Sequence, residues 1–495
     1  MISKGFLKSS IVYSVVGALP YASGFLLLPW FTAYLTPAQF GINAMYIALM
    51  YLVQVISSFG MDMSAGVLYF DYRDDREKLK SFLGTVFLTI SMLGALTFTV
   101  FLLGGLRLFN FVFSTGDFIE TIPFALFTIL SGVFNSVFKT YSGLLVNQQR
   151  PSRFFWLNIS NFALTIGASL VILYLFPYTL YGPVLGRLIP AVLIASTSLF
   201  MVRGEYGMRW ESGYLRKLFS YSSPIFLYAL LTWAVSYVDR FIIARQMGDT
   251  TLVGIYDIAV KLVIGLDLVM TGLVNTLNPR IYNTWKVTGQ RESDPVINRY
   301  YNGITALFLL IIPSFVIIVP LLLPLVIYKE IYYQAFAFLP LLAAGYATRT
   351  WFFMFLAPLL FFKRTAALPR VFAISAVFNI VVAIFLINRF GIIGAVWANF
   401  LVKPLQALLM YVECRKVYRF RVNRRKLFIA PGIYLATVVA TELLFTGELR
   451  IAAPYMHLLL AVVVVGVTYR RELVPWVNSL LERAGVFRAG GRTGE

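Results

Sequence analysis

Basic side chains in apolar surroundings are the residues of this chain that could do chemistry. Six of them lie inside long apolar stretches: Lys139, Arg187, Arg240, Lys261, Arg349 and Lys403. A charge at the centre of a bilayer costs about 2.5–3.5 kcal/mol on insertion scales, so such residues normally face a wet cavity or a charged partner. Arginine forks onto phosphate, and lysine adds a point charge. We therefore expect a cationic cavity that accepts an anionic cargo such as a pyrophosphate.

Local neutralisation of each cation is the alternative. Asp257 and Lys261 are four residues apart, so they would form a pair on one helix. Asp239 is adjacent to Arg240, and neighbouring side chains on a helix do not face each other, so we expect Asp239 to point elsewhere. Arg240 and Lys139 lie nearer to the ends of their spans, where long side chains reach the surface. The other four cations lie deeper.

The acids within or near the spans are fewer. A buried carboxylate can exchange a proton or hold sodium, which would couple transport to an ion gradient. Asp257 and Asp239 are the candidates for such coupling, and pairing with a neighbouring cation is the alternative for each. Asp62, Glu413 and Glu442 lie near membrane edges, where we expect no special role. We expect no other cofactor.

Single occurrences of cysteine and histidine exclude several kinds of site. The chain has one cysteine, Cys414, and one histidine, His457. A disulfide framework and a zinc site built from several cysteines or histidines are therefore excluded. The sequence GxxxxGK[ST] is absent, which excludes nucleotide hydrolysis by that route. We attribute the excess of Lys and Arg, 42 against 22 Asp and Glu, to cytoplasmic loops and not to nucleic acid.

Composition indicates that long helices position these charges. Of the 495 residues, 59% are hydrophobic and 13% are charged, whereas soluble domains are about one quarter charged. A helix needs about 20 apolar residues to cross the hydrocarbon. The sequence predicts an all-α polytopic membrane protein with fourteen transmembrane helices, near 9–35, 38–61, 81–104, 118–146, 154–176, 179–202, 218–246, 251–279, 298–328, 332–362, 370–388, 391–414, 427–446 and 452–470.

Charge distribution predicts the topology. With the N-terminus in the cytoplasm, inner segments hold 31 Lys and Arg, outer segments hold five, and six remain inside spans. This bias agrees with the positive-inside rule, so we expect both termini to be cytoplasmic. The outer loops are short, and the longest spans about 105–117. A polytopic glycosyltransferase or ligase would need a large acidic outer loop, so we expect a protein that is not an enzyme.

An internal repeat relates the two halves of the chain. Gly41 and Gly254 lie in similar motifs 213 positions apart, and Gly182 and Gly394 lie in similar motifs 212 apart. We infer a six-helix unit used twice, with an axis along the membrane normal. The predicted lobes are 1–202 and 203–414, and 415–495 adds helices 13 and 14 and a tail. Chance similarity of Gly-apolar patterns is the alternative. The cations follow the repeat, in the pairs Lys139 with Arg349 and Arg187 with Lys403.

Motifs around the seventh and eighth spans resemble a known family. They are Tyr221-Ser222-Ser223-Pro224, Val238-Asp239-Arg240 and Val253-Gly254-Ile255-Tyr256, and Leu35-Thr36-Pro37 precedes the second span. The pattern, over about residues 1–420, resembles the polysaccharide (O-antigen, Wzx-type) flippases of the multidrug/oligosaccharidyl-lipid/polysaccharide (MOP) exporter superfamily. That superfamily also contains the multidrug MATE exporters.

This resemblance implies a MATE-like fold and a flippase for surface polysaccharide biosynthesis, for instance of lipopolysaccharide. The expected cargo is an undecaprenyl-pyrophosphate-linked anionic oligosaccharide, moved across the bacterial inner membrane by alternating access. A proton or sodium ion is the expected coupling ion. Membrane lipids and a polysaccharide polymerase are the expected partners of a monomer, without nucleic acid.

Two transporter classes are rivals to this interpretation. A MATE-type antiporter usually carries a cationic cargo and should have an acidic cavity, whereas basic residues outnumber acids in the deep spans here. A lipid II flippase would share the basic cavity and the span count, and sequence separates it poorly from an oligosaccharide flippase.

Overall fold

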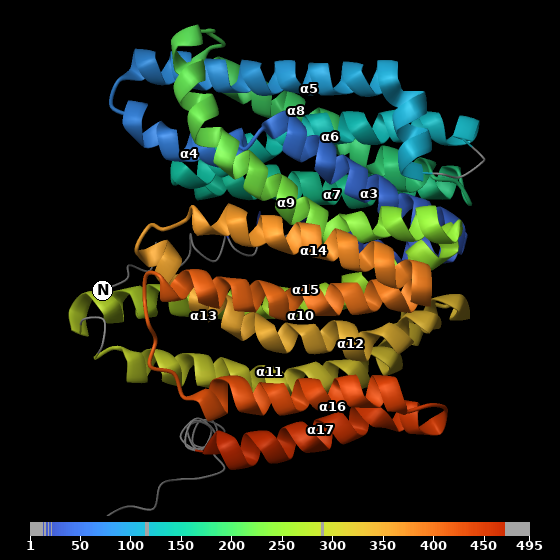
Figure 1. Cartoon of the computed structure of the whole chain (residues 1–495). Coiled ribbons are helices and arrows are strands. Elements are labelled where there is room, and N and C mark those ends of the chain that lie inside the picture. Colours follow the sequence, from blue (N-terminus) through green and yellow to red (C-terminus); the bar gives the residue numbers. More distant parts are fainter. Residues whose placement is uncertain are drawn as a thin grey trace, which may run out of the picture. The chain divides into compact units, whose positions relative to one another are not determined.

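The computed structural model describes residues 13, 16–17, 19–20, 22–113, 118–288 and 292–470, of which 105–113 and 118–121 are described in backbone only. In these ranges every regular element is a helix (Figure 1). The first elements are α2 (Leu28–Tyr34), α3 (Pro37–Ser58), α4 (Met61–Tyr72), α5 (Arg76–Phe113), α6 (Phe118–Asn147), α7 (Pro151–Leu175), α8 (Tyr181–Tyr206), η1 (Ser212–Tyr214) and α9 (Leu215–Met247).

The later elements are also helical. They are α10 (Thr250–Thr288), α11 (Asp294–Leu322), η2 (Leu323–Leu325), η3 (Glu330–Phe338), α12 (Leu339–Ala344), η4 (Gly345–Thr348), α13 (Arg349–Phe361), α14 (Ala367–Phe390), α15 (Ile392–Arg415), η5 (Arg425–Ile429), α16 (Ala430–Leu444) and α17 (Glu448–Thr468). The predicted all-α membrane fold is confirmed.

Eleven helices of the described ranges are long and apolar enough to cross a membrane. Three of the fourteen predicted spans are not among them. The stretch 9–35 begins among residues outside the described ranges, 251–279 lies within α10, and 332–362 is broken into shorter helices. The expected positions of the two termini also concern residues outside those ranges.

The second predicted span, 38–61, corresponds to one helix, α3. A capping box at Thr36 and a proline at the first helical position begin α3. The helix ends where Phe59 (φ 46°) and Gly60 (φ 73°) both adopt left-handed conformations. Glycine adopts this conformation freely, whereas phenylalanine does so at an energetic cost. The predicted end at residue 61 lies close to this break, and α4 begins directly after it.

The tenth predicted span, 332–362, is interrupted. Between Leu339 and Phe361 the chain forms α12, a 3-10 segment and then α13, which begins at Arg349. Broken helices inside membrane proteins occur where the irregular backbone is buried in protein or lines a cavity. The predicted span is therefore corrected to two short helices that meet next to a cation.

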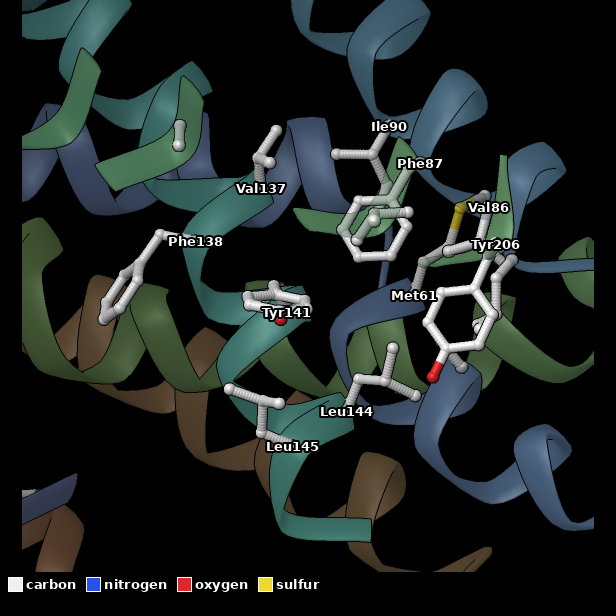
Figure 2. Packing of buried hydrophobic residues seen from close by; sticks show 14 of the residues in the cluster. Met61, Val86, Phe87, Ile90, Val137, Phe138, Tyr141, Leu144, Leu145 and Tyr206 are labelled. Atoms are coloured by element: carbon white, nitrogen blue, oxygen red, sulfur yellow. The ribbon is translucent and has the colours of Figure 1, made fainter. Parts of the chain in front are cut away.

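The chain divides into two compact units. The first is Met1–Ile258, Leu325–Tyr332 and Leu368–Ala395, and the second is Ala259–Pro324, Tyr333–Ala367 and Val396–Glu495. The predicted lobes, 1–202 and 203–414, stay a prediction. In the first unit, buried side chains from α4, α5, α6 and α8 form an apolar core around Met61, Phe87 and Tyr141 (Figure 2). In the second unit, α17 packs on α11 and α16.

One match of the internal repeat has the same geometry in both copies. A Cβ added at Gly182 would lie 2.8 Å from a side-chain atom of Leu173 on α7. A Cβ added at Gly394 would lie 2.2 Å from the backbone of Leu386 on α14. Leu173 and Leu386 are 213 positions apart, so each glycine lets its helix approach the preceding helix at the equivalent place. This supports the repeat that the sequence predicts.

Candidate functional site

Arg187 is a cation that the structure holds with neutral groups. It lies on α8, and its Nη1 donates to Asn43 Oδ1 at 3.0 Å and to the Pro183 carbonyl at 2.8 Å. The guanidinium also lies over the ring of Phe31, 5.8 Å from the centroid. Within the described residues no carboxylate comes within ion-pair distance of Arg187. The positive charge is therefore available to a ligand.

A pocket surrounds this guanidinium inside the first unit. Its lining residues come from α3, α6 and α8: Tyr46, Ile47, Met50, Thr128, Ser131, Val184 and Arg187. One cation and three hydroxyl groups lie among apolar side chains. Such a lining suits a small anionic group, because charged hydrogen bonds are strongest where water is scarce.

Asn43 is a residue of this site that the sequence reasoning missed. It lies on α3 and is fully buried. Its Oδ1 accepts from Arg187, and its Nδ2 has no hydrogen-bond partner in the part of the chain that the structure describes. A buried donor without an acceptor costs about 1–3 kcal/mol. The sequence contains a feature that could have identified Asn43, because it is a polar residue within the motif around Gly41 that the repeat shares.

Arg240 forms the centre of a buried ionic cluster with Asp239 and Asp257. Its Nη1 lies 2.6 Å from Asp239 Oδ1, and its Nη2 lies 3.3 Å from Asp257 Oδ1. Tyr256 donates to the second oxygen of Asp239 at 2.6 Å. The three ionic side chains are between 3% and 6% exposed.

Two expectations about this cluster are wrong. Asp239 does not point away from Arg240, because the long arginine side chain folds back along its own helix and also donates to the Ser236 carbonyl. Arg240 also does not extend to the surface. With both carboxylates ionised the cluster carries a formal charge of −1, and Asp257 interacts electrostatically with Arg187. The predicted pairing of Asp257 with Lys261 stays a prediction.

Arg349 is neutralised within the second unit. Its Nε donates to Asp267 Oδ1 on α10 at 2.8 Å, and the guanidinium lies 4.6 Å from the centroid of the Phe352 ring. The Arg349 and Asp267 side chains are 22% and 31% exposed. This partly exposed pair can rearrange without leaving a fully buried charge.

Lys403 lies on α15, and its contacts include uncharged groups. Its Nζ donates to the Asn399 carbonyl at 3.1 Å and to the Asn399 side-chain oxygen. The Nζ also lies 5.0 Å from the centroid of the Tyr346 ring, and the side chain packs on Gly345. The lysine thus contacts the 3-10 segment that interrupts the tenth span.

Lys139 forms an ion pair with Asp62, for which the sequence predicts no special role. Its Nζ lies 3.0 Å from Asp62 Oδ2, and the Asp62 side chain is 8% exposed. The expectation that Asp62 has no special role is therefore corrected, because it is the ion-pair partner of Lys139.

Lys261 is half-buried on α10. The first unit contains Lys139, Arg187 and Arg240 and the second contains Lys261, Arg349 and Lys403, so one cavity shared by all six stays a prediction.

Solved structures similar to this chain include a lipid II flippase and transporters of the MOP superfamily. The lipid II flippase MurJ in an inward closed conformation matches with a TM-score of 0.71 at 13% identity, over 94% of this chain and 100% of that chain. An inward-facing multidrug resistance MATE transporter of the MOP superfamily matches with a TM-score of 0.64 at 14% identity, over 84% and 98%. A MOP superfamily transporter from Pyrococcus furiosus, described as having a binding pocket of reversed polarity, matches with a TM-score of 0.54 at 14% identity, over 83% and 95%.

The sequence itself also identifies a family. No curated protein matches the chain at the threshold of significance. Residues 6–285, more than half of the chain, match the family described as polysaccharide biosynthesis protein. The chain belongs to this polysaccharide biosynthesis protein family and has the fold of the MOP exporters.

Proposed function

We propose that this protein is a flippase that moves an undecaprenyl-pyrophosphate-linked oligosaccharide across the bacterial inner membrane by alternating access. Arg187 carries the proposal, because it keeps a positive charge inside a membrane bundle without a carboxylate partner among the described residues. Retaining such a charge is costly, so a negative ligand is the simplest reason for it. The family match to polysaccharide biosynthesis supports a glycan as the cargo.

The pocket suits the phosphate end of the cargo better than its sugars. The pocket is much too small for an oligosaccharide, and its one cation suits a phosphate. In this proposal Arg187 is the cation of the first unit that binds phosphate, and Lys403 is the corresponding cation of the second unit. Arg349 and Lys261 join after their side chains rearrange, whereas Arg240 and Lys139 keep structural roles. Transport then requires no bond to be made or broken, and the protein is not an enzyme.

Coupling to an ion is part of the same proposal. The cluster of Asp239, Arg240 and Asp257 has one carboxylate more than it has cations. When a phosphate occupies Arg187, the excess negative charge loses its nearby counter-charge. A proton or sodium ion at Asp257 or Asp239 would restore neutrality, which links cargo binding to the ion gradient. We further propose a monomer with both termini cytoplasmic, working beside a polysaccharide polymerase.

A lipid II flippase is the second candidate. The match to MurJ over nearly the whole chain favours it, and its cargo carries the same pyrophosphate. Complementation separates the two. The gene should restore surface polysaccharide to a mutant that lacks its own oligosaccharide flippase, and it should fail to rescue cells depleted of their lipid II flippase. The opposite result would favour lipid II.

Deletion in the native host tests the main proposal. We expect the lipid-linked repeat unit to accumulate on the cytoplasmic side and surface polysaccharide to disappear. Wild-type protein should restore export. Arg187→Ala should not, while being inserted to the same level, and Arg389→Ala, which changes an exposed arginine in the last turn of α14, should restore it. Normal export in the deletion strain, with no other flippase present, would refute the proposal.

A further inference from the structure

The loop between α15 and α16 carries a dense positive charge. Residues 415–426, here called the basic loop, include no acid and seven basic residues: Arg415, Lys416, Arg419, Arg421, Arg424, Arg425 and Lys426. The positive-inside rule explains an excess of charge at this face of the membrane. It does not explain how these charges are arranged.

Several basic residues in the loops next to α5 and α9 are paired with acids. Lys78 pairs with Asp75, Lys80 with Glu77, and Lys217 with Asp71, each within 3.1 Å. In the basic loop Lys416 pairs with Glu413. The five arginines of the basic loop form no ion pair with any described residue. Their charge is therefore open to an external anion.

Buried contacts hold the basic loop in place. Tyr418 donates to Asp294 Oδ1 at 2.6 Å, and the Arg421 amide donates to Asp294 Oδ2 at 3.0 Å. Asn298 donates to the Arg421 carbonyl at 2.7 Å. Asp294 and Tyr418 are both buried. Burial, together with the hydrogen bond to Asp294, raises the pKa of Tyr418, so the hydroxyl remains a donor.

Aromatic packing adds to this anchor. The Tyr418 ring lies 4.6 Å from the Phe420 ring and 5.6 Å from the Trp285 ring. The backbone of the loop is thus fixed, while the side chains of Arg415, Arg419, Arg421, Arg424 and Arg425 are exposed. A fixed backbone lowers the entropic cost of presenting several charges at once.

We propose that the basic loop is a binding surface for the phosphate headgroups of anionic phospholipids. The loop connects two membrane-crossing helices, so its arginines lie at the level of the lipid headgroups. Basic clusters next to a span attract anionic lipids, and guanidinium groups bind phosphate oxygens in pairs. This site is separate from the Arg187 pocket and does not depend on the nature of the cargo.

The association of spin-labelled lipids with the full chain tests the proposal. The protein is reconstituted in phosphatidylcholine bilayers with trace spin-labelled phosphatidylglycerol or phosphatidylcholine, and the immobilised fraction of each is measured. For the wild type we expect roughly fivefold preference for phosphatidylglycerol, falling as salt is raised. The variant Arg419→Gln/Arg421→Gln/Arg424→Gln/Arg425→Gln should lose that preference.

A matched variant separates position from net charge. Lys78→Gln/Lys80→Gln/Arg209→Gln/Lys217→Gln removes the same charge from cations that have acid partners, so it should keep most of the preference. Tyr418→Phe keeps every charge and releases the anchor, and we expect an intermediate preference. The proposal is overturned if the basic-loop variant binds phosphatidylglycerol as the wild type does, or if the matched variant loses as much. Failure of glycan export would not affect this readout.

Discussion

At the scale of single residues, the cations within the spans are sorted by whether a carboxylate is in reach. Lys139, Arg240 and Arg349 have aspartate partners, whereas Arg187 is held by amide and carbonyl oxygens. Sequence predicted which positions carry charge, because basic residues stand out in apolar stretches. It could not predict the partners, since Asp62 and Lys139, for example, come together from different helices.

Giving Arg187 a carboxylate partner should abolish transport without unfolding the protein. Asn43→Asp would place an acid 3.0 Å from the guanidinium, so the arginine would be neutralised before cargo arrives. We expect export to fall about tenfold or more, since a charged hydrogen bond contributes about 1.5–3 kcal/mol. Thermal unfolding of the purified variant should be unchanged or raised. Unchanged export would show that the charge of Arg187 is not used.

Breaking the buried cluster of Asp239, Arg240 and Asp257 should lower the stability of the protein, unlike Asn43→Asp. Arg240→Met leaves two buried carboxylates without their cation, which typically costs about 3–5 kcal/mol. We expect a clearly lower midpoint of thermal unfolding in detergent. Lys217→Met, which removes one member of an exposed pair, should change the free energy by about 0–1 kcal/mol. Equal midpoints for the two variants would contradict a structural role for Arg240.

At the scale of elements, hydrophobic content predicted where helices lie and failed where they break. The break before α13 depends on local packing that apolar content does not encode. Packing also accompanies the end of α3, where the left-handed Phe59 stacks on Phe226 at 4.4 Å and makes an edge contact with Phe219.

The crossing of α3 and α10 depends on two glycines that the repeat pairs. A Cβ at Gly41 would lie 1.8 Å from the Thr250 carbonyl oxygen, and one at Gly254 would lie 2.8 Å from the Pro37 carbonyl oxygen. We expect Gly41→Ala to destabilise the protein by about 1–3 kcal/mol, measured by thermal unfolding, because backbone atoms must move apart. Gly272→Ala, with open space around it on α10, is the control and should be neutral or stabilising. A neutral Gly41→Ala would exclude the tight crossing.

The start of α5 should be sensitive to acid. Asp75 accepts from the Lys78 amide at 3.2 Å, and this hydrogen bond lowers the pKa of Asp75. Because the folded pKa is depressed, the stabilisation is present above the ordinary carboxyl pKa and is lost as pH falls through the folded value. Amide protection at Lys78 and Leu79 should therefore be higher in wild type than in Asp75→Ala at neutral pH, and the difference should vanish in strong acid. A difference that persists in acid would exclude the carboxylate as its cause.

At the scale of the whole molecule, the sequence predicted the fold class, the repeat and the family. Composition sufficed for the class because few soluble folds tolerate so little charge. The repeat was visible because Gly182 and Gly394 are each needed for a close helix approach. Which charges serve transport could not be predicted, since that depends on contacts between helices distant in sequence.

Reconstituted flipping of the cargo tests the central claim most directly. Proteoliposomes carrying an undecaprenyl-pyrophosphate-linked oligosaccharide are assayed for the fraction that becomes accessible from the opposite leaflet. We predict rapid flipping by wild type, roughly tenfold slower flipping by Arg187→Gln and partial activity of Arg187→Lys, because the positive charge binds the phosphate. Flipping by Arg187→Gln at the wild-type rate would contradict the account.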